Sequence, residues 1–398
     1  MYSFFLSFDT KDKPNFNRYY HIIITLQEET IAFMETIKTF NALGILSGSA
    51  LDGVDIVYIR TDGVDVYEFG HMMTIPYEEN LRQRVRSVLG VRPDTPENQL
   101  LLNEVEKELT NFWAQAAKDY IDTYAVHIDV IGLEGHTICN EPKEHFIYQL
   151  GDGELLSQLT GIKVVYNFHS ADVAAGGQGA PLDVTYYNAI TSQYPRPLAV
   201  VDISGISSIA WIGSYGEMVA FNSGPGNAAI DEWVMMHAGM HMDYNGKLAI
   251  TGHVNEQIVS AMMKHKYFGK YPPKSTHREA FREKLEHLEG LSLEDGAATA
   301  TAFVAESIAY SLLLYVPDIP KRIMVCGGGA KNPTLMRFLR QRLPNIEVCT
   351  AEDWECDSTA IGVQAVAYLA VRRLHFLPIS FPTTTGVYEP MVGGKITG

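Results

Sequence analysis

Apolar and polar positions alternate in a recurring unit near the middle of the sequence. An apolar run at residues 199–203 ends in a Ser-Gly turn, a second run occupies 209–212, and a third at 218–221 leads into a Gly-Pro-Gly corner. Alternation with a period of two predicts a strand for each run. After Asn227 the apolar spacing becomes that of a helix. The pattern therefore predicts strand, hairpin, strand, hairpin, strand, glycine corner and helix.

The same unit occurs earlier in the chain. An apolar run at 43–46 ends in a Ser-Gly-Ser turn, residues 55–60 alternate as a strand, and residues 64–74 read as a third strand. The two copies start roughly 155 residues apart, which suggests two similar lobes. Turns of Ser and Gly let backbone N–H groups converge on an anion. We therefore expect an α/β protein with two lobes, each contributing a phosphate-binding hairpin. Two ordinary hairpins in an α/β protein are the alternative.

The remaining segments supply the other helices and strands. Helical spacing covers residues 26–40, 77–89, 97–120, 154–160, 254–264, 293–315 and 359–373, and strand patterns cover 126–133, 163–168 and 322–326. Ser292 is the expected N-cap of the helix at 293–315. A glycine-containing loop at 169–181 falls between the two copies, and we expect it to lie in the cleft between the lobes. We divide the chain into an N-terminal extension (1–40), a first lobe (41–196) and a second lobe (197–398).

Composition narrows the classes of partner. The 398-residue chain has a formal net charge of −16, so we expect neither a nucleic acid nor a membrane as a partner. Its four cysteines show no CxxC pairing, which favours free thiols and a cytoplasmic location. The apolar start of the chain lacks a basic segment and does not read as a signal peptide. An acidic enzyme that handles ATP has to build its positive field from backbone amides, helix N-termini and a bound cation.

Six motifs resemble those of one family and follow in its order. They are Ser-Gly-Ser-Ala-Leu-Asp-Gly-Val-Asp at 47–55, Tyr-Gln-Leu-Gly-Asp at 148–152, Gly-Gly-Gln-Gly-Ala-Pro-Leu at 176–182, Gly-Pro-Gly-Asn at 224–227, Pro-Pro-Lys-Ser-Thr at 272–276 and Cys-Gly-Gly-Gly at 326–329. In these motifs the chain resembles the anhydro-N-acetylmuramic acid kinases, of the sugar kinase, heat-shock protein and actin superfamily. The resemblance implies a two-lobed actin-like ATPase fold of the ribonuclease H-like type, with duplicated hairpin and helix units around a central cleft.

The resemblance also implies an ATP-dependent sugar kinase. Members of the family transfer the γ-phosphoryl group of ATP to O6 of 1,6-anhydro-N-acetylmuramic acid while a water molecule opens the anhydro bridge. The product is N-acetylmuramic acid 6-phosphate, formed during peptidoglycan recycling. Phosphoryl transfer requires aligned phosphates and neutralised charge, normally from backbone amides and Mg²⁺. The implied partner is a small amino sugar from cell-wall turnover, and a homodimer is considered beside a monomer.

The matched motifs imply the residues that bind each substrate. The ATP side comprises the two Ser-Gly turns and the glycines that border adenosine: Ser47, Gly48, Ser49, Ala50, Leu51, Asp52, Gly53, Val54, Ser204, Gly205, Gly327, Gly328, Gly329 and Asn332. The sugar side comprises the glycine loop and the Gly-Pro-Gly corner: Asp172, Gly177, Gln178, Gly179, Ala180, Pro181, Gly224, Pro225 and Asn227. Asp52 is the expected ligand of Mg²⁺. Asp172 is either catalytic or an acceptor that stabilises its own loop.

The chain departs from the family at the catalytic base. The resemblance implies a base in an Asp-Thr-Gly-Pro-Gly-Asn motif, but Asn222 stands at the position of that aspartate. Loss of a positioned base typically costs about 10²–10⁴-fold in rate. Glu134 and His136 stand in the family's His-Gly-Gln-Thr motif. Asp202 stands in its Asn-Ile-Gly-Gly turn, and His169 in its arginine-rich segment.

Three explanations of these departures stay open. In the first, Glu134 or Asp202 takes over the role of the base. In the second, another amino sugar is phosphorylated without hydrolysis. In the third, the chain is an impaired enzyme or a pseudokinase that binds sugar and nucleotide, so a non-catalytic sensor of cell-wall fragments is the rival class. Lys274 and Arg278, after the paired prolines, either bind the lactyl carboxylate or stabilise their loop.

Overall fold

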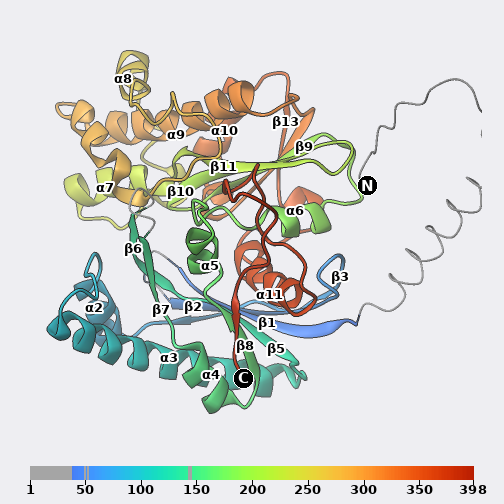
Figure 1. Cartoon of the computed structure of the whole chain (residues 1–398). Coiled ribbons are helices and arrows are strands. Elements are labelled where there is room, and N and C mark those ends of the chain that lie inside the picture. The colour runs from blue at the N-terminus through green and yellow to red at the C-terminus, as the bar shows by residue number, and fades with distance from the viewer. Residues whose placement is uncertain (1–37, 49–50, 52, 142–145) are drawn as a thin grey trace, which may run out of the picture. The chain divides into compact units, whose positions relative to one another are not determined.

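A computed structural model describes residues 38–48, 51, 53–141 and 146–398 (Figure 1). Residues 40–398 form an α/β protein with two main sheets and a separate two-stranded hairpin. The predicted helix at 26–40 lies outside the described residues except for residues 38–40. Ser49, Ala50 and Asp52 of the predicted first phosphate loop also lie outside them.

The first sheet contains the earlier copy of the repeated unit. Its strand order is β14-β8-β5-β1-β2-β3, and β4 also pairs with β2. The strands are β1 (Phe40–Ser47), β2 (Gly53–Thr61), β3 (Val66–Phe69), β4 (Met73–Pro76), β5 (Val130–Glu134), β8 (Lys163–Tyr166) and β14 (Lys395–Ile396). Strand β1 is antiparallel to β2 and parallel to β5. The prediction of one strand at 64–74 is wrong, because β3 and β4 pair with opposite ends of β2 on either side of Gly70.

The second sheet repeats this arrangement with the later copy. Its order is β11-β10-β9-β12-β13. The strands are β9 (Leu198–Ile203), β10 (Ile206–Ile212), β11 (Met218–Pro225), β12 (Arg322–Cys326) and β13 (Glu347–Thr350). Strand β10 is antiparallel to β9 and β11, and β9 is parallel to β12. In both sheets two antiparallel hairpins therefore precede parallel strands, which confirms the predicted duplication within an α/β fold.

Helices cover both sheets. They are α2 (Glu79–Ser87), α3 (Pro96–Tyr124), α4 (Gly153–Thr160), α5 (Phe168–Ala174), α6 (Val184–Ile190), α7 (Asn227–Ala238), α8 (Glu256–Met262), α9 (Leu293–Tyr315), α10 (Pro333–Arg342) and α11 (Ile361–Leu374). Short 3₁₀ helices are η2 (Tyr244–Gly246), η3 (Arg278–Leu288), η4 (Gly328–Lys331) and η5 (Glu352–Trp354), and the separate hairpin is β6 (His136–Glu141) with β7 (Phe146–Leu150).

Successive residues of the central strands enter different cores. In β1, Leu43 and Ile45 pack with Trp113 of α3, whereas Ala42 packs in a second core with α6 and α11. In β9, the successive residues Val200 and Val201 likewise enter different cores. Burial on both faces explains why these strands read as continuous apolar runs.

Helix α11 packs against the first sheet although it follows the second in sequence (Figure 1). A Cβ atom at Gly44 would lie 2.0 Å from the carbonyl oxygen of Val363, and one at Gly132 would lie 2.4 Å from that of Val366. Only glycine permits this close approach of helix and strand. Strand β14 also returns to the first sheet by pairing with β8. The lobe boundary near residue 197 stays a prediction. Helix α11 and strand β14 follow that boundary in sequence but pack on the first sheet.

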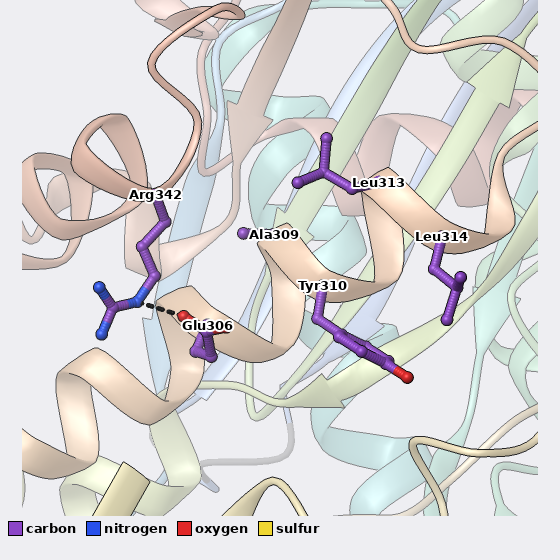
Figure 2. A pocket seen from close by; sticks show the side chains of 6 residues that line it. All are labelled: Glu306, Ala309, Tyr310, Leu313, Leu314 and Arg342. Atoms are coloured by element: carbon purple, nitrogen blue, oxygen red, sulfur yellow. Dashed lines mark ion pairs between the residues drawn. The ribbon is translucent and has the colours of Figure 1, made fainter. Parts of the chain in front are cut away.

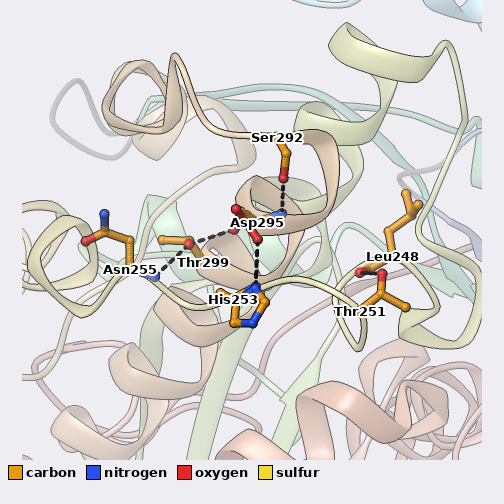
Figure 3. Close-up of polar contacts among 7 residues, drawn as sticks. All are labelled: Leu248, Thr251, His253, Asn255, Ser292, Asp295 and Thr299. Carbon is orange, nitrogen blue, oxygen red and sulfur yellow. Dashed lines mark hydrogen bonds and ion pairs between the residues drawn. The ribbon is translucent and has the colours of Figure 1, made fainter.

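Helix α9 is the one helix in the described residues that is long and apolar enough to span a membrane by length and composition. Its most apolar window has a mean hydropathy of 1.4 and is 78% buried within the protein. The predicted N-cap is confirmed, since Ser292 Oγ accepts the Asp295 N–H at 3.1 Å (Figure 3). Asp295 in turn accepts the backbone N–H of His253 at 2.7 Å. These contacts connect the start of the core helix to the segment that leads into α8.

Candidate active site

The first predicted phosphate loop begins at Ser47, which is only 7% exposed. Its Oγ accepts a hydrogen bond from the Tyr77 hydroxyl at 2.7 Å and lies 3.0 Å from Nδ1 of His136. Trp113 Nε1 donates to the same Tyr77 hydroxyl at 2.9 Å. Burial lowers the pKa of His136 to about 4, so its ring is neutral at pH 7. The side chain of Ser47 therefore anchors the loop, and a role in ATP binding stays a prediction for its backbone.

The described remainder of this loop consists of Gly48, Leu51, Gly53 and Val54. Leu51 has a φ of 56°, and its N–H donates to the Gly48 carbonyl at 3.1 Å. Leu51 therefore lies in the left-handed region, which non-glycine residues adopt rarely. A Cβ at Gly53 would lie 2.4 Å from the carbonyl oxygen of Ile75, so this position requires glycine. The described backbone has the tight geometry that the motif predicts, and the functional assignment remains a prediction.

The second predicted phosphate turn joins β9 to β10. The Ser204 side chain is exposed, and its Oγ donates to Oδ1 of Asp202 at 2.7 Å. The Gly226 N–H donates to the Gly205 carbonyl at 3.2 Å, and the Asn227 N–H donates to the Ser204 carbonyl at 2.8 Å. The predicted sugar-side residues Gly224, Pro225 and Asn227 belong to this corner. The structure therefore brings the second phosphate turn together with the start of α7.

The glycine run after β12 packs against the same turn. A Cβ at Gly327 would lie 2.8 Å from Oδ1 of Asp202, and a Cβ at Gly329 would lie 2.4 Å from Cγ2 of Ile203. A Cβ at Gly328, the residue between them, would lie 3.3 Å from Nδ2 of Asn227. The predicted adenosine-side glycines therefore lie beside Ser204 and Gly205. Asn332 caps α10, since its Oδ1 accepts two N–H groups of that helix at 3.1 Å, and its predicted ATP contact is not tested by this geometry.

Asp172 organises the glycine-rich loop (residues 176–181). Its carboxylate is fully buried, and it accepts the Gly179 N–H at 2.7 Å and the Thr385 hydroxyl at 2.6 Å. The Gln178 N–H donates to the Thr385 carbonyl at 2.8 Å. A Cβ at Gly177 would lie 2.0 Å from Oδ1 of Asp172, so only glycine fits there. Asp172 therefore has the contacts of a loop-stabilising acceptor. Ala180 and Pro181 are the last residues of the loop and precede α6.

Glu134 and His169 connect the glycine-rich loop to the first sheet. Glu134 ends β5, and its Oε1 lies 3.1 Å from Nε2 of His169 on α5. The other ring nitrogen of His169, Nδ1, lies 2.6 Å from the carbonyl oxygen of Gly179. One of the two candidate replacement bases thus borders the predicted sugar loop.

Asp183 is a site residue that the sequence analysis missed. It precedes α6, and its pKa is raised to about 7, first by burial and then by the charges of Glu134 and Asp202, although His169 opposes the shift. Burial also raises the pKa of Asp202, while its hydrogen bond from Ser204 lowers it. The signal in the sequence was an Asp at the start of a helix directly after the Ala-Pro-Leu of the sugar motif. That position reads equally well as a helix N-cap.

Asn222 is buried, and its side chain and backbone form hydrogen bonds with other residues of the protein. It is 3% exposed, and its Oδ1 accepts the Thr276 N–H at 2.9 Å. Its own N–H donates to the Lys274 carbonyl at 3.0 Å, and its carbonyl accepts the Tyr267 hydroxyl at 2.7 Å. The residue at the predicted position of the base therefore holds the proline loop (residues 271–276) against β11.

Lys274 lies in an aromatic cage rather than at a surface. The residue is 3% exposed, and among the described residues its Nζ has no hydrogen-bond partner. The Nζ lies 4.2 Å from the ring centre of Tyr315, 4.8 Å from that of Tyr267 and 5.6 Å from that of Phe221. Burial, with a smaller contribution from Lys270, lowers the pKa of Lys274 to about 8. This geometry favours the loop-stabilising role over a contact with a ligand carboxylate.

The proline loop also contacts the glycine-rich loop, because Ser275 Oγ donates to the Gln178 carbonyl at 3.2 Å. Hydrogen bonds and ion pairs thus connect Glu134, at the end of β5, to Asn222 on β11 through both loops. In the described part of the chain no group of three or more His, Cys, Asp or Glu side chains is placed to hold a metal ion. Asp52, the predicted Mg²⁺ ligand, lies outside that part.

A hollow of about 370 Å³ lies elsewhere, beside α9 (Figure 2). Its lining consists of Glu306, Ala309, Tyr310, Leu313, Leu314 and Arg342, and it includes no predicted site residue. Figure 2 shows the ion pair between Glu306 and Arg342, at 2.6 Å, on one side of the three large apolar and aromatic side chains. The candidate site is therefore defined by its loops and not by this hollow.

A family model and two relatives with known names match this chain over most of its length. The model of the family described as "Anhydro-N-acetylmuramic acid kinase" matches residues 40–398. The anhydro-N-acetylmuramic acid kinase of Paramagnetospirillum magneticum is 40% identical over 359 residues, which cover 89% of this chain and 98% of the relative. That of Zymomonas mobilis is 41% identical over 365 residues, with 89% and 99% coverage.

Two solved structures are similar at low sequence identity. The activator of the 2-hydroxyisocaproyl-CoA dehydratase from Clostridium difficile with bound ADPNP is 12% identical, with a TM-score of 0.41 over 84% of this chain and 96% of its own. A ROK hexokinase from Thermus thermophilus is 12% identical, with a TM-score of 0.37 over 85% of this chain and 100% of its own.

Proposed function

Because the chain belongs to the anhydro-N-acetylmuramic acid kinase family, we propose that it transfers the γ-phosphoryl group of ATP to O6 of 1,6-anhydro-N-acetylmuramic acid. In the same reaction a water molecule adds to the anomeric carbon and the anhydro bridge opens. ATP, sugar and water thereby give ADP and N-acetylmuramic acid 6-phosphate. The observation that carries this proposal is the family match over residues 40–398.

ATP is assigned to the glycine turns at the ends of β1, β9 and β12. The contacts of Gly327 and Gly329 with the end of β9 support this assignment, since they gather backbone N–H groups without bulky side chains. Mg²⁺, when bound, supplies positive charge to the phosphate oxygens during transfer. Asp52 keeps its predicted role as the Mg²⁺ ligand, and Asp202 is the carboxylate beside the second turn.

The sugar is assigned to the glycine-rich loop and the Gly-Pro-Gly corner. The N–H groups of Gly177, Gln178 and Gly179 donate within the protein, so the carbonyl oxygens of this loop would accept hydrogen bonds from the hydroxyl and amide groups of the sugar. Lys274 is enclosed by aromatic rings, so Arg278 is the cation that we assign to the lactyl carboxylate. A cytoplasmic location and a homodimer belong to the same proposal, and light scattering of the purified protein tests the homodimer.

Glu134 is our first candidate for the base that activates water. It contacts His169, which holds Gly179 of the predicted sugar loop. Asp202, the second candidate, is bonded instead to Ser204 of the predicted ATP turn. The contacts of Asn222 with the proline loop support a structural role for this amide, consistent with a base elsewhere.

A sugar- and nucleotide-binding protein without turnover is the second candidate function, and the observation that favours it is the amide at position 222. The test measures ADP release from ATP, Mg²⁺ and the anhydro sugar, and it includes the variants Glu134→Gln, Asp202→Asn and Asn222→Asp. Turnover by the wild type that is lost only in Glu134→Gln supports the first assignment.

Calorimetric titration of each substrate accompanies the turnover assay. A silent wild type that binds both substrates, together with a gain of turnover in Asn222→Asp, supports the binding protein. A wild type that binds neither ATP nor the sugar contradicts both functions. Loss of turnover in Asp202→Asn with an active Glu134→Gln moves the base to Asp202.

A further inference from the structure

His169 uses both of its ring nitrogens. Nδ1 lies 2.6 Å from the carbonyl oxygen of Gly179, and Nε2 lies 3.1 Å from Oε1 of Glu134. The His169 side chain is 16% exposed and that of Glu134 is 26% exposed, so water competes weakly for these contacts. Both ring nitrogens of His169 are therefore bonded to groups of the protein and not to water.

The two partners determine the charge of the ring. A backbone carbonyl can only accept a hydrogen bond, so Nδ1 carries a proton. An ionised carboxylate also only accepts, so Nε2 carries a proton as well. With both nitrogens protonated, His169 is an imidazolium ion. Burial alone lowers the pKa of His169, but Glu134, the Gly179 carbonyl and Asp183 outweigh it and raise the pKa to about 9.

Two side chains on one face of α5 bind the N–H group and the carbonyl group of Gly179. His169 and Asp172 are three residues apart on this helix and therefore point the same way. Asp172 accepts the Gly179 N–H at 2.7 Å, while His169 donates to the Gly179 carbonyl. Gly179 has a φ of 83°, a conformation that glycine tolerates and that leaves the loop dependent on external contacts.

We propose that His169 is a positioning residue whose imidazolium charge fixes the Gly179 carbonyl and the Glu134 carboxylate, so that the glycine-rich loop is ordered for the sugar. The inference deepens the proposed function, on which its sugar assignment rests. The charged and titratable groups that face His169 are Glu134 from β5 and Asp183 from the start of α6. Loss of its proton removes one donor and the charge that opposes these two carboxylates.

The test compares His169→Gln and His169→Arg with the wild type between pH 6 and pH 10, with the KM for sugar and for ATP measured separately. In the wild type the sugar KM should rise as the pH passes about 9, while the ATP KM stays level. His169→Gln should raise the sugar KM about tenfold or more at pH 7, the usual effect of losing a charged hydrogen bond. His169→Arg should restore most of the affinity and move the alkaline rise to higher pH, because guanidinium does not titrate there.

The matched control is His253→Gln, since the His253 side chain is 94% exposed and pairs with Asp295 far along the chain from these loops. It should leave both KM values and their pH profiles unchanged. A His169→Gln enzyme with the wild-type sugar KM, or with the wild-type alkaline rise, overturns the proposal. Equal changes in the sugar and ATP KM values overturn it too, because they indicate a general loss of structure.

Amide hydrogen exchange separates this inference from the proposed function. In His169→Gln, exchange at residues 176–180 should accelerate about tenfold while exchange in β9 and α9 stays unchanged. If no sugar turns over but this local acceleration is found, the positioning role stands and the proposed function falls. If sugar turns over and the loop exchanges as in the wild type, the positioning role falls.

Discussion

Ser275 Oγ donates a hydrogen bond to the carbonyl oxygen of Gln178 at 3.2 Å, across 97 positions of the chain. It joins the proline loop, which Asn222 holds, to the glycine-rich loop, which Asp172 and His169 hold. A change at any of these four side chains should therefore reach both loops. The contact also gives the first prediction, because the donor can be removed without changing the backbone.

Ser275→Ala should raise the sugar KM about two- to tenfold, since a neutral hydrogen bond contributes about 0.5–1.5 kcal/mol. The ATP KM should stay within a factor of about two, because no hydrogen bond joins Ser275 to the described residues of the assigned ATP turns. Steady-state kinetics with each substrate varied in turn measures both constants. Ser87→Ala, on the exposed side of α2, is the control. Equal effects of the two variants would contradict the role of the loop contact.

Asn222→Leu should lower the free energy of unfolding by roughly 1–3 kcal/mol, because the buried N–H of Thr276 loses its acceptor. Asn222→Asp should be milder, since a carboxylate oxygen can still accept that N–H. Urea unfolding at pH 7 measures both values. If Asn222→Leu unfolds at the same urea concentration as the wild type, the hydrogen bond does not stabilise the fold.

Thr385→Val should destabilise the protein by about 2 kcal/mol. The hydroxyl of Thr385 donates to the buried carboxylate of Asp172, and hydrogen bonds to charged groups contribute about 1.5–3 kcal/mol. Valine keeps the shape of the side chain, so little packing is lost. Thr123→Val, on an exposed position of α3, is the matched control and should change stability little. Thermal unfolding of the two variants side by side decides the matter.

Asp183→Asn should stabilise the protein in a pH-dependent way. The pKa of Asp183 is about 7 in the folded protein against an ordinary value of 3.8, so the folded state binds a proton between these values that the unfolded state releases. The free energy of unfolding therefore falls as pH rises from about 4 to about 7 and stays lower above it. Each unit of pKa difference corresponds to about 1.4 kcal/mol.

In urea titrations the Asp183→Asn variant should thus exceed the wild type by more than about 1 kcal/mol at pH 8, and the difference should shrink toward pH 4. Asp119→Asn, on an exposed part of α3, is the control and should show no such trend. A difference that stays constant from pH 4 to pH 8 would mean that Asp183 titrates normally.

Tyr77→Phe should cost about 1–3 kcal/mol, because the buried Trp113 N–H loses its acceptor and Ser47 loses a donor. The first predicted phosphate loop starts at Ser47, so the ATP KM should rise as well. Tyr388→Phe is the control, since Tyr388 is 95% exposed. An unchanged ATP KM in Tyr77→Phe would show that the hydrogen bonds among Ser47, Tyr77 and Trp113 do not contribute to nucleotide binding.

The repeated strands were predictable because each carries its own signal. Residues 199–203 and 209–212 alternate or stay apolar over the whole strand, so β9 and β10 were found from local pattern alone. The break between β3 and β4 was not, since it depends on both strands pairing with β2, and pairing leaves no mark in the segment 64–74 itself. The same reason hid the return of α11 and β14 to the first sheet.

The candidate site was predictable in its glycines and less so in its charged groups. A Gly-Gly-Gln-Gly run indicates a backbone that needs positive φ or a close approach, and Gly179, with a φ of 83°, and Gly177, which lies against Asp172, have these features. Their roles in binding stay predictions. The partners of Asp172 and Asn222 are instead set by tertiary contacts, with Thr385 lying 213 positions from Asp172 and Thr276 lying 54 from Asn222. The aromatic cage of Lys274 likewise gathers rings from three separate segments, which no local pattern predicts.

Val164 of β8 and Thr397 exchange two hydrogen bonds of 3.0 Å across 233 positions. During translation, β8 therefore leaves the ribosome long before the strand that covers its outer edge has been made. An uncovered strand edge is a template for pairing with other chains. Until residues 395–397 have been made, this edge of β8 is open to such pairing, and a chain cut before Lys395 would leave it open.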